Sequence, residues 1–136
     1  MNVLEFLHTR QSNPHLQGVA PDEATINSIL QAGMRVPDHA GLIPWHFTVV
    51  KGDGLTKLGK AFKSAVISDG ADEAKIEKAA KMPFRAPLII VISTKFQQHV
   101  KVPQQEQLIS AGCAAHAMQM AATSLGLGAM WRTGEM

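Results

Sequence analysis

The sequence predicts helices that flank a few strands, an α+β or α/β fold. The chain has 136 residues, of which 46% are hydrophobic, enough for one domain with a buried core. Residues 45–51 and 88–94 are rich in β-branched, aromatic or aliphatic side chains, as strands are. Other segments repeat apolar residues at three- and four-residue steps, as helices do. No repeat, low-complexity segment or linker is found, so we expect a single domain over residues 1–136.

Two helices are expected before the first strand. The first is short and ends near Arg10, where a polar loop follows. The second starts with Pro21 in its first turn, since proline lacks the amide that would have no partner there, and Pro37 ends it. Their apolar faces consist of Val3, Phe6, Leu7, Ile26, Ile29, Leu30 and Met34.

The first strand, residues 45–51, is expected to end at the sequence Gly52-Asp53-Gly54. A third helix follows, and the charged segment 72–81 predicts a solvated fourth helix. Two prolines end this helical region. The apolar face of the third helix consists of Leu55, Leu58, Phe62 and Val66. The two prolines are Pro83 and Pro87.

The second strand, residues 88–94, is apolar on both faces, which is typical of a central strand covered by helices. A polar loop at 95–105 precedes a long helix that continues to about Leu125, with Gly126 as a left-handed cap. The segment GAMWRTG then predicts the start of another strand.

The long helix has no charged residue between Gln107 and Trp131, a length that could cross a bilayer. However, His116, Gln119 and Thr123 form a polar stripe along it, and lipid would penalise these groups. Small residues dominate the rest of its surface. We therefore expect the central helix of a soluble core rather than a membrane span.

Composition excludes several functions. The formal charge of +2 comes from 13 basic and 11 acidic residues without a basic run, which argues against nucleic acid or an anionic membrane as partner. The single cysteine, Cys113, excludes an internal disulfide framework. Glu5, His8 and Arg10 interrupt the apolar run that a secretory segment would need, so the cytoplasm is expected.

Motifs for metal or nucleophilic chemistry are weak. The chain has no HExxH, paired CxxC, GxSxG or Walker sequence, and its GxG follows a helix, the reverse of a dinucleotide-binding turn. Cys113 near His116 is expected to be a small buried hydrophobic residue. A metal-dependent hydrolase using His39, His46 and Cys113 remains a formal alternative.

Three arginines lie near the ends of predicted elements: Arg10, Arg35 and Arg132. Each alone is best explained by solvation or by a favourable interaction with a helix C-terminus. Together with the hydroxyls of Ser12 and Thr133, they suggest a site for an anionic ligand such as a phosphate. Spacing alone leaves that site a conjecture.

Five segments resemble the nitroreductase family of flavoproteins, and most closely its YdjA-like branch. The segments are TRQS, ILQAGMRVPDHAGLIPWHFTVVKG, PFRAPLIIVI, VPQQEQLISAGCAAHAMQMAATSLGLG and MWRTG. The resemblance implies an α+β, nitroreductase-like fold with a mostly antiparallel central sheet flanked by helices. It also implies an intertwined homodimer with an FMN at each of two interfacial sites.

The resemblance implies a role for each matched residue and requires no catalytic side chain, and the motifs lead us to expect no metal site. On the phosphate side of FMN it places Arg10, Gln11 and Ser12, with Trp131, Arg132 and Thr133 of the same subunit. Arg35 and His39 would reach the flavin from the other subunit, and Trp45 is expected to pack in the core. The stretch matched to NAD(P)H is Ala121, Ala122, Thr123, Ser124, Leu125 and Gly126.

The resemblance implies an FMN-dependent NAD(P)H oxidoreductase that passes electrons to nitroaromatic or quinone-like acceptors by a ping-pong mechanism. The alternative is a non-catalytic module that binds or sequesters flavin. Family members usually continue beyond the WRTG segment with a further strand and helices. The chain is therefore expected to be either a fragment or a curtailed member that lacks the C-terminal segment.

Overall fold

The computed structural model describes residues 2–133, which form two compact units. Unit 1 comprises 2–14, 21–48 and 91–131, and unit 2 comprises 15–20, 49–90 and 132–133. The elements are α1 (Val3–Thr9), α2 (Glu23–Gly33), η1 (His39–Gly41), β1 (Trp45–Lys51), α3 (Asp53–Ser68), α4 (Glu73–Lys81), η2 (Met82–Arg85), β2 (Leu88–Thr94) and α5 (Gln104–Ser124). Helices and a small sheet confirm the α+β class. The single domain stays a prediction.

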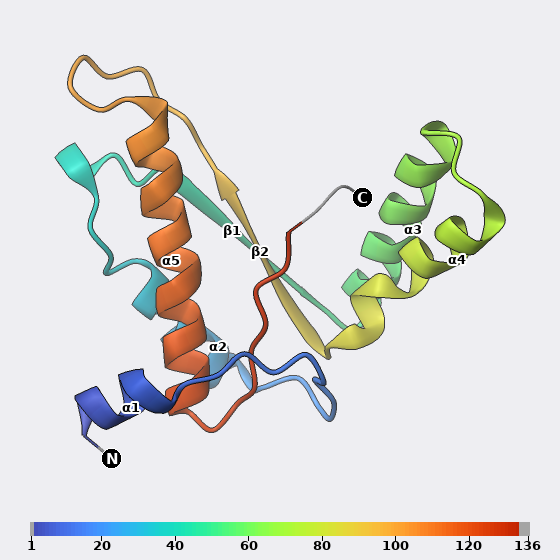
Figure 1. The fold of residues 1–136 in the computed structure, drawn as a ribbon, viewed down its shortest axis with the longest axis horizontal. Helices are drawn as coiled ribbons and strands as arrows, with labels where there is room; N and C mark the ends of the chain where they lie inside the picture. The colour runs from blue at the N-terminus through green and yellow to red at the C-terminus, as the bar shows by residue number, and fades with distance from the viewer. Residues whose placement is uncertain (1, 134–136) are drawn as a thin grey trace. The chain divides into compact units, whose positions relative to one another are not determined.

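The core of unit 1 forms where α2 packs along α5 (Figure 1). Ile26 and Ile29 of α2 are buried there, as the helical period predicted. The two helices approach closely because α2 ends in Gly33. A Cβ on this glycine would lie 2.3 Å from Met118 Cε and 3.2 Å from Phe47 Cζ.

In unit 2, α3 packs against α4 with a charged outer surface. Leu55, Val66 and Ala79 are buried between the elements of this unit. The contact is tight at Gly59, where a Cβ would lie 2.6 Å from the Ala80 carbonyl oxygen. Burial of an amphipathic face therefore explains this hairpin.

Strands β1 and β2 pair in a two-stranded sheet. The Lys95 amide, just after β2, donates to the Pro44 carbonyl, just before β1, over 2.8 Å. The start of one strand therefore lies beside the end of the other, and the pair is antiparallel.

Several expectations about the elements are wrong. Asp22 caps α2 by accepting a hydrogen bond from the Thr25 amide, so Pro21 precedes the helix instead of lying in its first turn. Helix α2 ends at Gly33, before Pro37, and Met34 is exposed rather than buried. The bend at Gly52 is confirmed, but Asp53 and Gly54 already belong to α3 because an acidic residue favours a helix N-terminus. Pro83 lies within η2, and helical structure ends at Arg85, just before Pro87, so only the second of the two prolines marks the end as predicted.

The central position expected for 88–94 is also wrong within residues 2–133. Strand β2 has only β1 as a partner there, and none of its residues is buried. The described part of GAMWRTG, residues 128–133, forms no strand, and Gly134 lies outside the described residues. Helix α5, in contrast, ends as predicted, with Gly126 at a φ of 81° and the Leu127 amide bonded to the Ala122 carbonyl. No helix of the described part of the chain has the length and apolar character of a membrane span.

Candidate functional site

The Pro-Asp-His loop between α2 and β1 is closed by Asp38. The Asp38 carboxylate accepts hydrogen bonds from the Leu42 amide (3.1 Å) and the Ile43 amide (2.7 Å). Ala40 and Ile43 have φ values of 63° and 49°, in the left-handed region that side chains disfavour. Such backbone strain persists only where neighbouring contacts fix the conformation.

Helix α5 and the segment before it supply those contacts. Ser110 Oγ donates to the Pro37 carbonyl over 2.5 Å, and the Glu106 carboxylate lies 2.7 Å from His39 Nδ1. Gln97 Nε2 donates to the Leu42 carbonyl. The beginning, middle and end of the loop are therefore each bonded to a side chain from the region 97–110.

Gln107 is the buried centre of this arrangement, with only 1% of its surface exposed. Its Oε1 accepts from the Gln97 amide, and its Nε2 donates to the carbonyls of Gln97 (2.8 Å) and Val102 (3.2 Å). A buried side-chain amide whose donors and acceptor all have partners stabilises its surroundings and fixes their geometry. Gln107 therefore holds the segment from which Gln97 reaches the loop.

Trp45, at the start of β1, packs in the core as expected. It is 6% exposed and clusters with Ala111 and Ala114 of α5. Its ring stacks on Phe47 with centroids 6.2 Å apart, and its indole nitrogen donates to Met34 Sδ over 3.2 Å. The aromatic residues behind the loop thus anchor β1 to α5 and do not form a stacking surface for a ligand.

The segment after α1, which carries three predicted phosphate-side residues, lies beside the segment after α5. The Asn13 amide donates to the Ala129 carbonyl over 2.9 Å, which places the neighbours of Ser12 and of Trp131 side by side in unit 1. Arg10 Nη1 lies 3.4 Å from Ser12 Oγ. Gln11 and Ser12 are exposed, so their polar groups are accessible.

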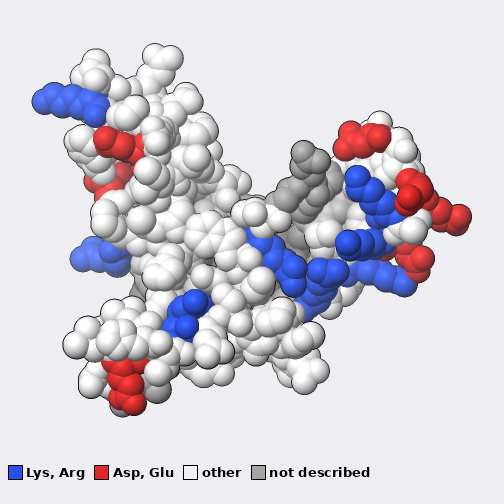
Figure 2. Space-filling model, in the orientation of Figure 1, with Lys and Arg blue, Asp and Glu red and all other residues white. Residues whose placement is uncertain are grey.

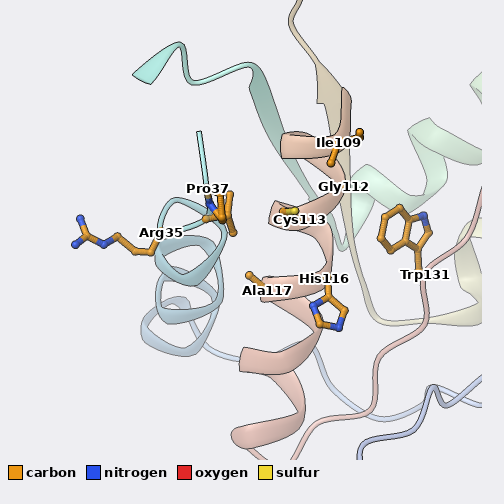
Figure 3. Close-up of a pocket in the computed structure, with 9 residues that line it drawn as sticks. Arg35, Pro37, Ile109, Gly112, Cys113, His116, Ala117 and Trp131 are labelled. Carbon is orange, nitrogen blue, oxygen red and sulfur yellow. The ribbon is translucent and has the colours of Figure 1, made fainter. Parts of the chain in front are cut away.

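An open cavity of about 510 Å³ lies beside α5 in unit 1 (Figure 3). Two predicted site residues line it, Arg35 and Trp131, but the Arg35 guanidinium points away from α5. The other residues of the cavity lining were not predicted as site residues from the sequence. Those on α5 recur at three- and four-residue steps, which could have shown that they share one face of the helix. The missed residues are Val36, Pro37, Ile109, Gly112, Cys113, His116 and Ala117.

Other predicted site residues lie elsewhere. None of residues 121–126 lines the cavity, and the hydroxyls of Thr123 and Ser124 donate to carbonyls of their own helix, those of Gln119 and Ala121. His39 lies outside the cavity as well. Arg132 and Thr133 belong to unit 2, so their convergence with Arg10 stays a prediction.

Residues 2–133 contain no group of three or more His, Cys, Asp or Glu side chains placed to hold a metal ion. The three residues of the hydrolase alternative, His39, His46 and Cys113, are accordingly not gathered into a metal site. His39 instead pairs with Glu106, and Cys113 is partly buried beside the cavity.

Comparisons with known proteins bear on this geometry. The model of the nitroreductase family matches residues 7–135. YdjA of Escherichia coli (strain K12), which carries the name of an NAD(P)H nitroreductase, is 45% identical over 136 residues, covering 100% of this chain and 74% of the relative. A similarly named protein of Haemophilus influenzae is 39% identical, covering 99% and 74%.

Solved structures share the fold. A nitroreductase-like family protein from Bacillus cereus superposes with a TM-score of 0.82 at 19% identity, covering 99% of this chain and 71% of that one. A nitroreductase with bound FMN from Bacteroides fragilis has a TM-score of 0.72 at 26% identity, covering 93% and 67%. These similarities confirm the fold that the sequence motifs implied.

Proposed function

The chain belongs to the nitroreductase family, and on that premise we propose that it is an FMN-dependent NAD(P)H oxidoreductase. The observation that supports this most directly is the bond between Asn13 and Ala129. It holds the segment of Arg10, Gln11 and Ser12 beside the segment that leads to Trp131, as a shared cofactor site would require.

The groups of the first segment fit a flavin phosphate. A phosphate is bound well by a guanidinium together with neutral donors, because charge-assisted hydrogen bonds are short and strong. Arg10 supplies the guanidinium, Ser12 a hydroxyl and Gln11 a side-chain amide, and the last two are exposed. We assign Arg132 and Thr133 to the same phosphate, with Trp131 beside the cofactor.

Arg35 and His39 are proposed to reach the FMN of a second subunit. Both are exposed, and the Arg35 guanidinium points away from its own α5 (Figure 3). The loop that carries His39 is held firmly by α5, so it can present a side chain outward with little loss of freedom on binding. The proposed assembly is a homodimer with FMN at its interface.

Bound FMN would supply the hydride and electron chemistry, and the protein would bind and orient the reactants. The proposed scheme is ping-pong, in which NAD(P)H and a nitroaromatic or quinone-like acceptor occupy the same site in turn. Residues 121–126 are assigned to NAD(P)H through their backbone, since the hydroxyls of Thr123 and Ser124 are bonded within α5. We place this activity in the cytoplasm.

The visible spectrum of the purified protein tests the proposal. A yellow protein, or one that becomes yellow with added FMN, should bleach when NAD(P)H is added without oxygen. A protein that stays colourless after incubation with FMN contradicts the proposal. Retained FMN that NAD(P)H does not bleach would instead identify a flavin-sequestering module.

Removal of one proposed phosphate ligand should weaken FMN binding. Arg10→Ala or Arg132→Ala is expected to cost about 1.5 to 3 kcal/mol, the scale of a hydrogen bond to a charged group. Titration of FMN fluorescence measures this loss. Arg85→Ala, which removes an exposed arginine of η2, is the matched control and should leave the affinity unchanged. Unchanged affinity in both test variants would remove the phosphate role.

A further inference from the structure

Helix α5 begins in an unusual way that leaves one carboxylate available. In a capping box, the acidic residue at the third helical position bonds to the backbone amide of the N-cap residue. Glu106 occupies that third position in α5, but the N-cap is Pro103, which has no amide proton. Glu106 therefore cannot form the box, and its carboxylate contacts His39 instead.

The contact determines which nitrogen of His39 carries a proton. An ionised carboxylate only accepts hydrogen bonds, so at 2.7 Å from Glu106 Oε2 the His39 Nδ1 must be the protonated donor. In the neutral ring Nε2 is then an acceptor, and it points away from Glu106 because the outward directions of the two ring nitrogens diverge widely. The other nearby carboxylate, of Asp38, is bonded to the amides of Leu42 and Ile43.

The backbone on both sides of His39 is fixed independently of this pair. Ser110 holds the Pro37 carbonyl, and Gln97 holds the Leu42 carbonyl. What remains free is the rotation of the His39 side chain, which is 55% exposed. Without a partner, this ring would adopt several rotamers and two tautomers, and a ligand would have to select one of them.

We infer that Glu106 is a positioning residue, which holds the ring of His39 in one orientation and one tautomer so that Nε2 is presented to the flavin. The inference rests on the proposed function, because it takes FMN as the ligand of His39. Neither the helical period nor the family segments assign Glu106 to the site. The two residues are 67 positions apart in the sequence.

The test combines imidazole NMR on the ligand-free protein with FMN titration. In the wild type, the His39 signals, assigned by their loss in His39→Gln, should show one tautomer with the proton on Nδ1. Glu106→Gln should give a mixture of tautomers, since an amide both donates and accepts. It should weaken FMN binding about two- to fivefold, because the contribution of an exposed pair is small.

Two controls separate positioning from a general effect of lost charge. Glu77→Gln makes the same substitution in another exposed pair, that of Glu77 with Lys81 on α4, and should change neither the His39 spectrum nor FMN affinity. In the double variant His39→Ala/Glu106→Gln, the second change should add no further loss of affinity.

Three outcomes overturn the inference. They are a tautomer mixture in the wild type, an unchanged tautomer in Glu106→Gln, and a changed tautomer with unchanged FMN affinity. A wild-type protein that binds no FMN overturns the proposed function and with it the role of Glu106. The NMR measurement, made without flavin, still shows in that case whether Glu106 controls the ring.

Discussion

The Pro-Asp-His loop of unit 1 and the α3–α4 hairpin of unit 2 are held by different forces. The loop depends on directional hydrogen bonds from Ser110 and Gln97, and the buried Gln107 in turn holds Gln97. The hairpin depends on burial of an apolar face, and charged side chains crowd on its surface (Figure 2). Over α5, by contrast, the visible surface is almost free of charge.

The two regions place different demands on the amino-acid sequence. Apolar packing tolerates many sequences because it is non-directional, so it suits a hairpin whose task is to fold. A loop with residues in left-handed conformations needs partners at fixed positions. In unit 1 the buried polar Gln107 therefore supports the loop that presents His39. Substitutions in the two regions should change the free energy of unfolding by different amounts.

The largest expected effect is in the polar network. Gln107→Met keeps the size of the side chain but removes the partners of the Gln97 amide and of two carbonyls. We expect a loss of about 2 to 3 kcal/mol in the free energy of unfolding, since one unpaired buried polar group costs about 1 to 3 kcal/mol. Urea unfolding monitored by Trp fluorescence measures the loss.

Gln105→Met is the matched control, because Gln105 is exposed on the same helix. It should change the unfolding free energy by less than about 0.5 kcal/mol, as is usual for surface positions. Equal stability of the two variants would contradict the distinction between a loop held by hydrogen bonds and a hairpin held by packing.

A medium effect is expected at Gly59, where α3 packs directly against the backbone of α4. In Gly59→Ala the new methyl would meet the Ala80 carbonyl oxygen at 2.6 Å, and a helix backbone cannot easily move away. We expect a net loss of about 1 to 2 kcal/mol, since overpacking outweighs the gain in helix propensity. Thermal unfolding followed by circular dichroism tests this.

Gly33→Ala provides the comparison in unit 1. There the methyl would lie 2.3 Å from Met118 Cε, the end of a flexible side chain, and also 3.0 Å from Met118 Cγ and 3.2 Å from Phe47 Cζ. This variant should lose less stability than Gly59→Ala, because its closest contact is with a side-chain end that can shift and not with helix backbone. A larger loss at Gly33 than at Gly59 would show that α2 and α5 are the less adaptable pair.

The smallest effect concerns pH. The hydrogen bond from the Thr25 amide lowers the pKa of the Asp22 carboxyl below its ordinary value of 3.8. The ionised form therefore stabilises α2 above that value, and this stabilisation is lost as the pH falls through the lower pKa of the folded chain. Asp22→Asn keeps a cap that does not titrate. Relative to this variant, the wild type should lose stability as the pH falls below 3.8 in urea unfolding, whereas parallel pH curves would refute the role of the charge.

Local periodicity predicted most elements well. Residues 45–51 and 88–94 are strands at the predicted boundaries, and the capping glycine at 126 ends α5 as expected. The errors arose where tertiary context decides. The apolar content of β2 suggested cover on both faces, yet burial depends on neighbours that a pattern within one segment does not contain. Met34 is apolar and yet exposed, one residue beyond the end of α2.

The site was predictable only in part. Family membership followed from long matching segments, and the bond from the segment after α1 to Ala129, close in sequence to Trp131, agrees with it. The polar contacts to the loop were not anticipated, because Ser110 and Pro37 are 73 positions apart and no sequence period links a hydroxyl to a distant carbonyl. The proline at the N-cap of α5 was the one local signal that the carboxylate of Glu106 had no capping partner.

The bond between Asn13 and Ala129 has a consequence for the order of folding. It joins segments separated by almost the whole described sequence, and closing so large a loop is entropically costly until intervening contacts have formed. Such pairings belong to the slow, non-local part of a folding reaction. During synthesis, then, the first residues must wait for the last described ones to leave the ribosome before they can dock.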